Sequence, residues 1–250
     1  MILLIDGTSD SRSLASDLVN AGYSIIASAT TPDAVYKLES NNVRAITGRM
    51  DCELLISKCK ELSIDAIIDA SHPYAEIMHE NAIKASDELK IPVIRFERNK
   101  IGIIDRNITY VEDYAKASKL ASITGKNILI TTGIKNAEAF ENLIMEKNVF
   151  FRILPEPLNI KFLIDMGVKK DHIIAMEGNF TENLNKAIME FYNIDTVITK
   201  DSGFNTEPKI RAAMSMKINV IIVSRKEYEW KNVGHSTVEI KKILSNYGIK

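Results

Sequence analysis

The sequence predicts an α/β protein with two Rossmann-like lobes and mainly parallel sheets. Three observations lead to this fold class. Short apolar segments alternate with longer amphipathic ones, the short segments are apolar on both faces, and the pattern repeats once along the chain. With 250 residues, of which 46% are hydrophobic and 26% charged, the chain has a globular composition and can bury a core without a metal or disulfide.

The expected strands are short runs rich in Ile and Val: Ile2–Ile5, Ser24–Ala29, Val43–Ile46, Ala66–Asp69, Val93–Phe96, Asn127–Thr132, Val149–Leu154, Ile173–Met176, Thr196–Thr199 and Val220–Val223. Helix-length segments separate them, such as Ser9–Ala21, Asp51–Leu62, Tyr74–Leu89, Tyr114–Ile123, Thr181–Phe191 and Glu207–Met216. This alternation predicts right-handed βαβ crossovers.

The two halves of the chain resemble each other. The segment from Ile2 to Gly7 resembles the one from Ile128 to Gly133, and Asp65–Ser71 resembles Asp195–Asp201. We therefore expect an N-terminal lobe over residues 1–100 and a C-terminal lobe over residues 101–250, joined around Asn99–Asn107. A cleft between the lobes is expected at the carboxyl ends of the strands, where open α/β sheets bind ligands.

Charge and cysteine content exclude several classes. Lys and Arg number 32 and Asp and Glu 33, so nothing predicts a nucleic-acid or membrane partner. No apolar run approaches the ~20 residues of a membrane span, and the initial run Met1–Ile5 is too short for a signal peptide. Cys52 and Cys59 lie in one expected helix, too far apart for a disulfide, and we expect reduced thiols and no metal site. A soluble cytoplasmic protein is expected.

Polar residues follow two strands of the N-terminal lobe. After the first strand, Gly7 permits a tight turn, Thr8 and Ser9 can cap the next helix, and Arg12 can reach a phosphate bound at the helix N-terminus. The second and third glycines of GxGxxG are missing, so an ordinary capped turn is the alternative.

The fourth strand is followed by a His and a Tyr on either side of a proline, in Ser71-His72-Pro73-Tyr74-Ala75. Histidine titrates near neutral pH, and its place at a strand end favours a functional role. A helix cap at Ser71 and a packing role for Tyr74 are the alternatives.

Polar clusters also follow three strands of the C-terminal lobe. Thr131-Thr132-Gly133 can present hydroxyl and amide groups to an anion. Arg152 lies inside an apolar strand, which is costly unless it meets an anion or a partner at the lobe interface. Thr199-Lys200-Asp201-Ser202-Gly203 forms the third cluster, with Thr206 and Lys209 a turn further on. Solvated strand ends without a function are the alternative.

These elements together resemble the precorrin-6A reductases of cobalamin biosynthesis, including the cobalt-precorrin-6A form. The resemblance covers nearly the whole chain and rests on Gly7-Thr8-Ser9-Asp10-Ser11-Arg12, Ser71–Ala75, Arg95-Phe96-Glu97-Arg98, Thr131–Gly133, Arg152-Ile153-Leu154-Pro155 and Thr199–Gly203, followed by Thr206, Lys209, Ala212 and Ala213. Asp6 stands where the family usually has a second glycine, and Asp10 where it usually has Glu.

The resemblance implies a nicotinamide-dependent enzyme that uses NADPH or NADH. It would reduce one ring double bond of a flat polycarboxylate macrocycle, precorrin-6A or cobalt-precorrin-6A, to the 6B form. The implied cofactor-binding residues are Gly7, Thr8, Ser9, Asp10, Arg12, Ser28, Thr30, Ser71, His72 and Pro73. The implied substrate-binding residues are Thr131, Thr132, Gly133, Lys135, Arg152, Lys200, Asp201, Ser202, Gly203, Thr206 and Lys209.

A proton must follow the hydride onto the substrate, and Lys200, His72 and Tyr74 are the candidate catalytic donors, with bound water as an alternative. The expected second strand ends in Ser28-Ala29-Thr30-Thr31, with neither the acid of an NAD site nor the base of an NADP site. A two-lobed binding protein without catalysis is the main rival class. A short-chain dehydrogenase needs Tyr-x-x-x-Lys, and no Tyr of this sequence has a Lys four residues later.

Overall fold

The computed structural model describes every residue except 98–101, 179, 202 and 204–206, and its chain divides into two compact units. Unit 1 comprises Met1–Arg98 and Lys226–Lys250, and unit 2 comprises Asn99–Arg225. The expected C-terminal lobe of residues 101–250 is therefore wrong for residues 226–250. These residues belong to unit 1 because they add a strand to its sheet. The expected cleft between the lobes stays a prediction.

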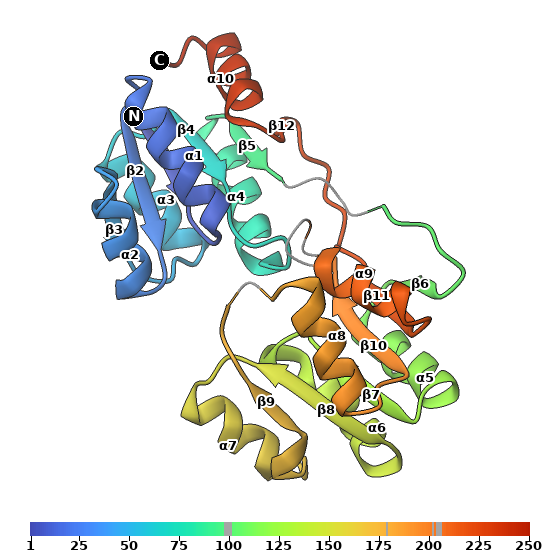
Figure 1. Cartoon of the computed structure of the whole chain (residues 1–250). Coiled ribbons are helices and arrows are strands. Elements are labelled where there is room, and N and C mark those ends of the chain that lie inside the picture. The colour runs from blue at the N-terminus through green and yellow to red at the C-terminus, as the bar shows by residue number, and fades with distance from the viewer. Residues whose placement is uncertain (98–101, 179, 202, 204–206) are drawn as a thin grey trace. The chain divides into compact units, whose positions relative to one another are not determined.

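Unit 1 contains a parallel sheet in the order β12-β5-β4-β1-β2-β3 (Figure 1). Its strands are β1 (Ile2–Ile5), β2 (Ile25–Ala29), β3 (Arg44–Thr47), β4 (Ala66–Asp69), β5 (Val93–Phe96) and β12 (Val233–Gly234). Its helices are α1 (Ser9–Asn20), α2 (Pro32–Glu39), α3 (Cys52–Glu61), α4 (Glu76–Leu89) and α10 (Thr237–Asn246). Leu3 and Leu4 enter different core clusters because successive strand residues point to opposite faces. Both faces of the sheet are thus buried, as the apolar strands predict.

Unit 2 repeats this arrangement with the order β6-β11-β10-β7-β8-β9 (Figure 1). Its strands are β6 (Ile108–Val111), β7 (Asn127–Ile130), β8 (Asn148–Ile153), β9 (Ile173–Ala175), β10 (Thr196–Lys200) and β11 (Asn219–Val223). Its helices are α5 (Tyr114–Thr124), α6 (Glu141–Glu146), α7 (Pro157–Asp165), α8 (Glu182–Phe191) and α9 (Glu207–Ser215), with 3-10 segments at Ile134–Phe140 and Lys170–His172.

The matching strand orders bear out the repeat that the sequence predicts. In unit 1, β1 pairs with β2 and β4, and in unit 2 its counterpart β7 pairs with β8 and β10. The remaining strand of each sheet, β12 or β6, breaks the match. Unit 1 takes β12 from the end of the chain, whereas unit 2 takes β6 from the segment before β7.

Strands β6 and β12 were not among the expected strands, and most expected boundaries shift by a residue or two. The helix expected from Tyr74 begins at Glu76, and its N-cap residue Ala75 makes no side-chain capping bond. Ser71 therefore does not cap it. Cys52 and Cys59 lie in α3 as free cysteines, and burial raises the pKa of the Cys59 thiol to about 11. Among the described residues, no helix combines the length and apolar character that crossing a membrane requires.

Candidate functional site

The turn between β1 and α1 is held together by the carboxylate of Asp6 and the hydroxyl groups of Thr8 and Ser11. Thr8 is the N-cap of α1, and its Oγ1 accepts from the Ser11 amide at 3.1 Å while Ser11 Oγ accepts from the Thr8 amide at 2.9 Å. Ser9, expected as a cap, is instead the first helical residue. The buried Asp6 carboxylate accepts from the Ser11 hydroxyl and pairs with Arg12 at 3.2 Å. Arg12, expected to reach a phosphate, is thus held by Asp6.

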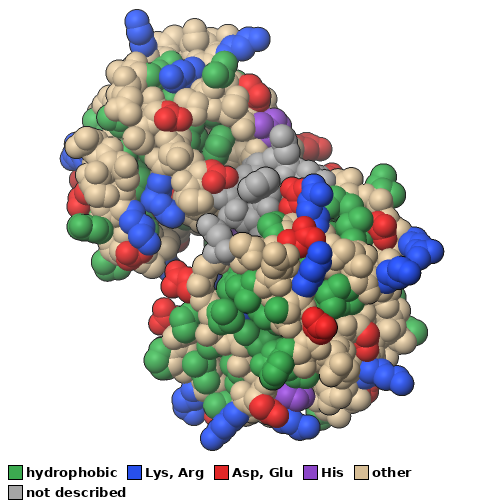
Figure 2. Space-filling model, viewed as in Figure 1, with side chains coloured by type: hydrophobic (Ala, Val, Ile, Leu, Met, Phe, Trp, Pro, Cys, Tyr) green, Lys and Arg blue, Asp and Glu red, His purple; other side chains and the backbone are tan. Residues whose placement is uncertain are grey.

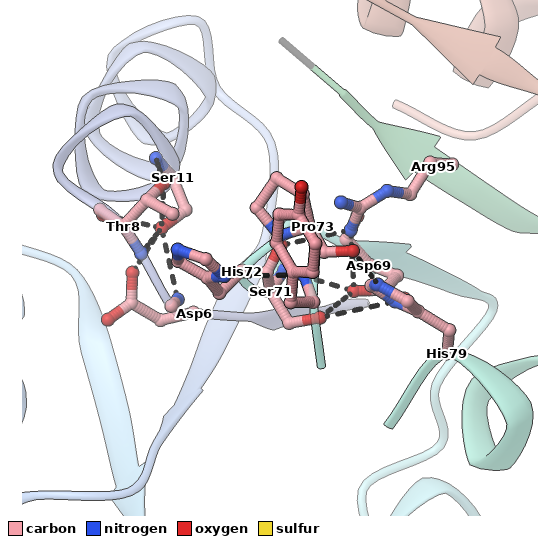
Figure 3. A network of polar contacts seen from close by, with 11 residues as sticks. Asp6, Thr8, Ser11, Asp69, Ser71, His72, Pro73, His79 and Arg95 are labelled. Atoms are coloured by element: carbon pink, nitrogen blue, oxygen red, sulfur yellow. Dashed lines mark hydrogen bonds and ion pairs between the residues drawn. The ribbon is translucent and has the colours of Figure 1, made fainter. Parts of the chain in front are cut away.

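Gly7 is required by the neighbouring loop. A Cβ atom at this position would lie 2.6 Å from the His72 amide nitrogen and 2.9 Å from Ser71 Cα, closer than side chains pack. Gly7 was expected to permit a tight turn, and the structure shows that it also lets two backbones meet. The turn after β1 and the loop after β4 therefore lie side by side (Figure 3). Ser28 at the end of β2 joins this edge, since its carbonyl accepts from the Asp6 amide at 2.8 Å, while Thr30 just beyond is exposed.

A buried polar network supports the loop after β4 (Figure 3). Asp69, the last residue of β4, accepts from the Ser71 hydroxyl and from His79 Nδ1, both at 2.6 Å, and from Arg95 Nη1 at 3.1 Å. Burial alone would raise the pKa of Asp69, but the hydrogen bond from His79 and the charge of Arg95 lower it. Arg95 also donates to the Ser71 carbonyl at 3.1 Å.

His72 and Tyr74, two of the candidate proton donors, follow this network and are half-buried. Nδ1 of His72 lies 3.3 Å from the Tyr74 amide, and the two rings lie 5.9 Å apart. Pro73 lies between them and presents its carbonyl to His79. The loop thus has a defined conformation with the imidazole and the phenol on one short segment.

A polar pocket of about 330 Å³ lies along α1 and the C-terminal end of α2 in unit 1. It is lined by Ser9, Arg12, Ser13, Ser16, Asp17, Lys37 and Asn41. Ser9 and Arg12, which the sequence also predicts, lie in the first turn of α1, where a hydroxyl group and a cation suit a phosphate. The other lining residues lie beyond that turn, and dinucleotide binding stays a prediction.

In unit 2, cations gather where β7, β8 and β10 end. Lys209 reaches from α9 and donates from Nζ to the hydroxyls of Thr131 at 2.9 Å and Thr199 at 2.8 Å. Its side chain is buried, and the pKa of Lys209 lies well below its usual value because of burial and the nearby charges of Arg152 and Lys200. Within the described residues its hydrogen-bond acceptors are these two hydroxyl groups, and burying a cation without a carboxylate partner is costly.

Arg152 lies in β8 and donates to Asn185 Oδ1 at 2.8 Å, while its guanidinium carbon lies 4.3 Å from the centroid of the Phe180 ring. Burial lowers the pKa of Arg152 to about 10. Lys200 ends β10, and burial followed by the charge of Lys135 lowers its pKa to about 8. None of the described partners of Arg152 and Lys209 is a carboxylate.

Thr132 adds a polar atom without a partner. Its side chain is 3% exposed, and its hydroxyl has no hydrogen-bond partner in the described part of the chain. Gly133 follows with a φ of +81°, which favours glycine. A buried hydroxyl without a partner beside several cations fits a site whose ligand accepts hydrogen bonds.

Asp201 differs from the other expected substrate residues because its carboxylate is already bound. Buried Arg225 donates from Nε to the Asp201 carbonyl at 2.7 Å, and Nη2 lies 3.3 Å from Oδ1. The Gly203 amide donates to the same carboxylate at 3.3 Å. Asp201 therefore shapes this loop. Ser202 and Thr206 lie outside the described residues.

Sequence reasoning did not assign site roles to Asp69, His79, Arg95 and Arg225. The signal for two of them was present, because Asp69 and Arg95 are charged residues in apolar strands, like Arg152. Among the described residues, no group of three or more His, Cys, Asp or Glu is placed to hold a metal ion.

Two parallel sheets with helices on both faces, one with a capped helix N-terminus and one with a cation cluster at its strand ends, define a two-domain Rossmann-type protein. The family model "Precorrin-6x reductase CbiJ/CobK" matches residues 1–245, and the chain belongs to this family. It is thus an oxidoreductase of cobalamin biosynthesis that acts on a carbon–carbon double bond.

Individual relatives agree with the family. The chain is 33% identical over 98% of both chains to a cobalt-precorrin-6A reductase of Priestia megaterium. It is 36% identical to the enzyme of the same name from Methanococcus maripaludis, over 96% of this chain and 97% of that one. A solved structure of the precorrin-6A reductase CobK superposes with a TM-score of 0.84 at 20% identity, over 100% of this chain and 97% of that one, and shows the same fold.

Proposed function

We propose that this chain reduces one ring double bond of cobalt-precorrin-6A with a reduced nicotinamide dinucleotide and gives the 6B form. The names of its relatives support the cobalt-bearing substrate. Identity is 33% and 36% to the cobalt-precorrin-6A reductases of Priestia megaterium and Methanococcus maripaludis. It is 27% to the precorrin-6A reductase of Rhodococcus erythropolis.

The observation that carries the proposal is the cation cluster of unit 2. Burial lowers the pKa values of Arg152, Lys200 and Lys209, and neighbouring cations lower those of the two lysines further. A bound carboxylate would relieve the cost that the protein alone bears. Arg152 can hold a carboxylate in bidentate fashion, and Lys200 can hold one as a point charge. The Thr132 hydroxyl then gains an acceptor. A flat macrocycle with several carboxylate side chains fits this set.

Two exposed apolar residues follow strands at this edge of unit 2. Leu154 and Met176 directly follow the paired strands β8 and β9, and their residues are 53% and 38% exposed. Figure 2 shows hydrophobic side chains gathered on the face of unit 2 that this view presents. Exposed apolar groups at the edge that carries the cations suit a ligand with an apolar ring system and a charged rim.

Unit 1 supplies the groups that hold the nicotinamide dinucleotide. Ser9, Asp10 and Arg12 lie at the start of α1, and the loop from Ser71 to Pro73 packs against the same turn. Bound reduced nicotinamide supplies the hydride. The residues at the end of β2, including Ser28 and Thr30, carry neither the acid of an NAD site nor the base of an NADP site. The binding of NADH and of NADPH is therefore measured in parallel.

Lys200 is the proton donor that its lowered pKa favours. A pKa of about 8 keeps most of its ammonium charged at neutral pH and lets it release a proton more readily than an ordinary lysine. His72 and Tyr74 are the alternative donors from unit 1.

Steady-state reduction with purified protein tests the proposal, with cobalt-bearing and metal-free precorrin-6A and each nicotinamide. We expect the highest kcat/KM with the cobalt-bearing macrocycle. Arg152→Ala should raise the macrocycle KM roughly 10–100-fold, since a charge-assisted pair is worth about 1.5–3 kcal/mol, and leave the nicotinamide Kd within about twofold. Arg211→Ala, an exposed arginine of α9, is the matched control. A folded protein that reduces neither macrocycle contradicts the proposal, and an equal loss on both ligands contradicts the role of Arg152.

A further inference from the structure

His79 is a buried histidine that the proposed reaction does not use. It lies on α4 and is 2% exposed. Its Nδ1 lies 2.6 Å from Asp69 Oδ2, and its Nε2 lies 3.4 Å from the Pro73 carbonyl. Both neighbours are acceptors, and the Ser71 hydroxyl, 3.4 Å from Nδ1, already donates to Asp69. The ring thus lies between the Asp69 carboxylate and the Pro73 carbonyl, with one nitrogen at each.

This geometry excludes two other roles. A Ser-His-Asp triad needs the serine on one ring nitrogen and the carboxylate on the other, whereas Ser71 and Asp69 both lie at Nδ1. A proton donor to substrate needs an accessible nitrogen, whereas Nε2 faces a main-chain carbonyl in a buried position. The imidazole instead contacts Asp69, which supports the loop from Ser71 to Tyr74, and Pro73 in the middle of that loop.

The segment after Arg225 covers His79. The rings of Tyr228 and Trp230 approach His79 edge-on, with centroids 5.4 Å and 5.7 Å away. Lys226 binds Glu80 on the same helix at 2.9 Å. These aromatic rings keep water from the Asp69–His79 pair, and a hydrogen bond to a charged group is stronger where water is excluded.

We propose that His79 is a positioning residue that fixes the Ser71–Tyr74 loop for nicotinamide binding, by joining Asp69 on one side to the Pro73 carbonyl on the other. The proposal rests on the assignment of this loop to the nicotinamide under the proposed function. His79 acts on the cofactor only through the loop, so its loss changes the nicotinamide Kd and leaves carboxylate recognition by unit 2 unchanged.

Two conservative variants of the full chain separate positioning from simple structural support. An asparagine amide overlies Nδ1 of histidine, so His79→Asn keeps a donor to Asp69 and loses the bond to Pro73. A glutamine amide reaches the place of Nε2, so His79→Gln keeps the bond to Pro73 and loses the one to Asp69. We measure the nicotinamide Kd by fluorescence, the macrocycle KM, and the thermal unfolding midpoint. His172→Asn and His172→Gln, at a half-buried histidine of unit 2 whose Nδ1 lies 3.1 Å from the Val149 carbonyl, are the matched controls.

We expect His79→Asn to raise the nicotinamide Kd about tenfold with little change in the unfolding midpoint, because a misplaced loop costs binding. His79→Gln should keep the Kd within about threefold although its midpoint falls further, because Asp69 loses a partner. A Kd that follows the midpoint in both variants, or that does not change in either, overturns the proposal. Failure of the wild-type protein to bind either nicotinamide overturns the proposed function instead, so the two failures are distinguishable.

Discussion

Units 1 and 2 share their strand order and differ in the charges at their strand ends. In unit 1 the carboxylates of Asp6 and Asp69 are each held by an arginine of the same unit. In unit 2, Arg152 and Lys209 are held by an amide and by hydroxyl groups. The comparison teaches that the fold determines where the ligand loops lie, while a few buried charges determine what each loop can bind.

The exception in unit 2 sharpens this comparison. Asp201 is held by Arg225 much as Asp69 is held by Arg95. The first pair joins the end of β4 to β5, and the second joins the residue after β10 to the segment after β11. Each unit thus uses one buried ion pair to shape a loop, and unit 2 adds cations that no carboxylate among their described partners neutralises.

The largest predicted effect comes from breaking the ion pair of unit 1. Arg95→Met removes a buried cation and leaves Asp69 with one fewer partner, so the free energy of unfolding should fall by about 3–5 kcal/mol. Lys209→Met removes a buried cation of unit 2 that has no carboxylate, so the unfolding free energy at pH 7 should stay the same or rise.

Urea denaturation measures both variants. Arg211→Met is the control, because its exposed i,i+4 pair with Glu207 is worth less than about 0.5 kcal/mol. A Lys209→Met variant that is destabilised as much as Arg95→Met would show that the cations of unit 2 are compensated like those of unit 1, and the comparison would fail.

The second effect concerns the contact between the two loops of unit 1. Gly7→Ala places a Cβ against the His72 and Ser71 backbone, so overpacking should cost about 1–3 kcal/mol and weaken nicotinamide binding as both loops shift. Gly22→Ala is the matched control, since Gly22 has open space and a φ of +87°, and should cost about 1 kcal/mol from backbone strain alone. Equal nicotinamide affinity in both variants would mean that these loops do not hold the cofactor.

Much of the fold could be predicted from the sequence because its strands are buried on both faces. Runs such as Ile2–Ile5 are visible without any partner, and the repeat indicates two similar units. The return of residues 226–250 to unit 1 could not be predicted in this way. Strand β12 has only two residues, and no local pattern states that Val233 pairs with Arg95. Long-range pairing is decided by packing that periodicity does not record.

The candidate site divides similarly. Strand ends led to the predictions for His72 and Lys200, because parallel strands bring such residues to one edge. A charge inside an apolar strand led to the prediction for Arg152. The partners that give these loops their shape were missed, since His79 lies ten residues and Arg95 26 residues from Asp69. The family resemblance implied that Asp201 binds substrate, and nothing in the sequence indicated that its carboxylate contacts Arg225, 24 residues away.

A smaller effect is the pH dependence that Lys200 should produce. Its pKa is lowered from 10.5 to about 8, so below pH 8 the buried charge destabilises the folded protein. The free energy of unfolding relative to that of Lys200→Met should therefore rise as the pH increases from about 8 to 10.5. Over the same range Lys200 loses its charge, so the macrocycle KM should rise roughly tenfold between pH 7 and pH 10.

Initial rates at saturating nicotinamide give the KM profile. In Lys200→Met the pH-dependent rise should vanish. In Lys135→Met the rise should move to higher pH, because the nearby charge of Lys135 helps to lower the pKa of Lys200. A profile unchanged in both variants would remove Lys200 from the substrate site and leave His72 and Tyr74 as the candidate proton donors.

The smallest predicted effect uses two buried hydroxyls without partners. Thr132 follows the carboxyl end of β7 at the cation cluster, whereas Thr196 begins β10 at the opposite edge of the sheet. Valine has nearly the same shape and no hydroxyl, so Thr132→Val and Thr196→Val should each leave the unfolding free energy unchanged or raise it by about 1 kcal/mol. Only Thr132→Val should weaken macrocycle binding, by roughly threefold to tenfold, the value of one neutral hydrogen bond. If both variants bind the macrocycle as the wild type does, the Thr132 hydroxyl is a packing defect like that of Thr196, and the cations of unit 2 must recognise the carboxylates without it.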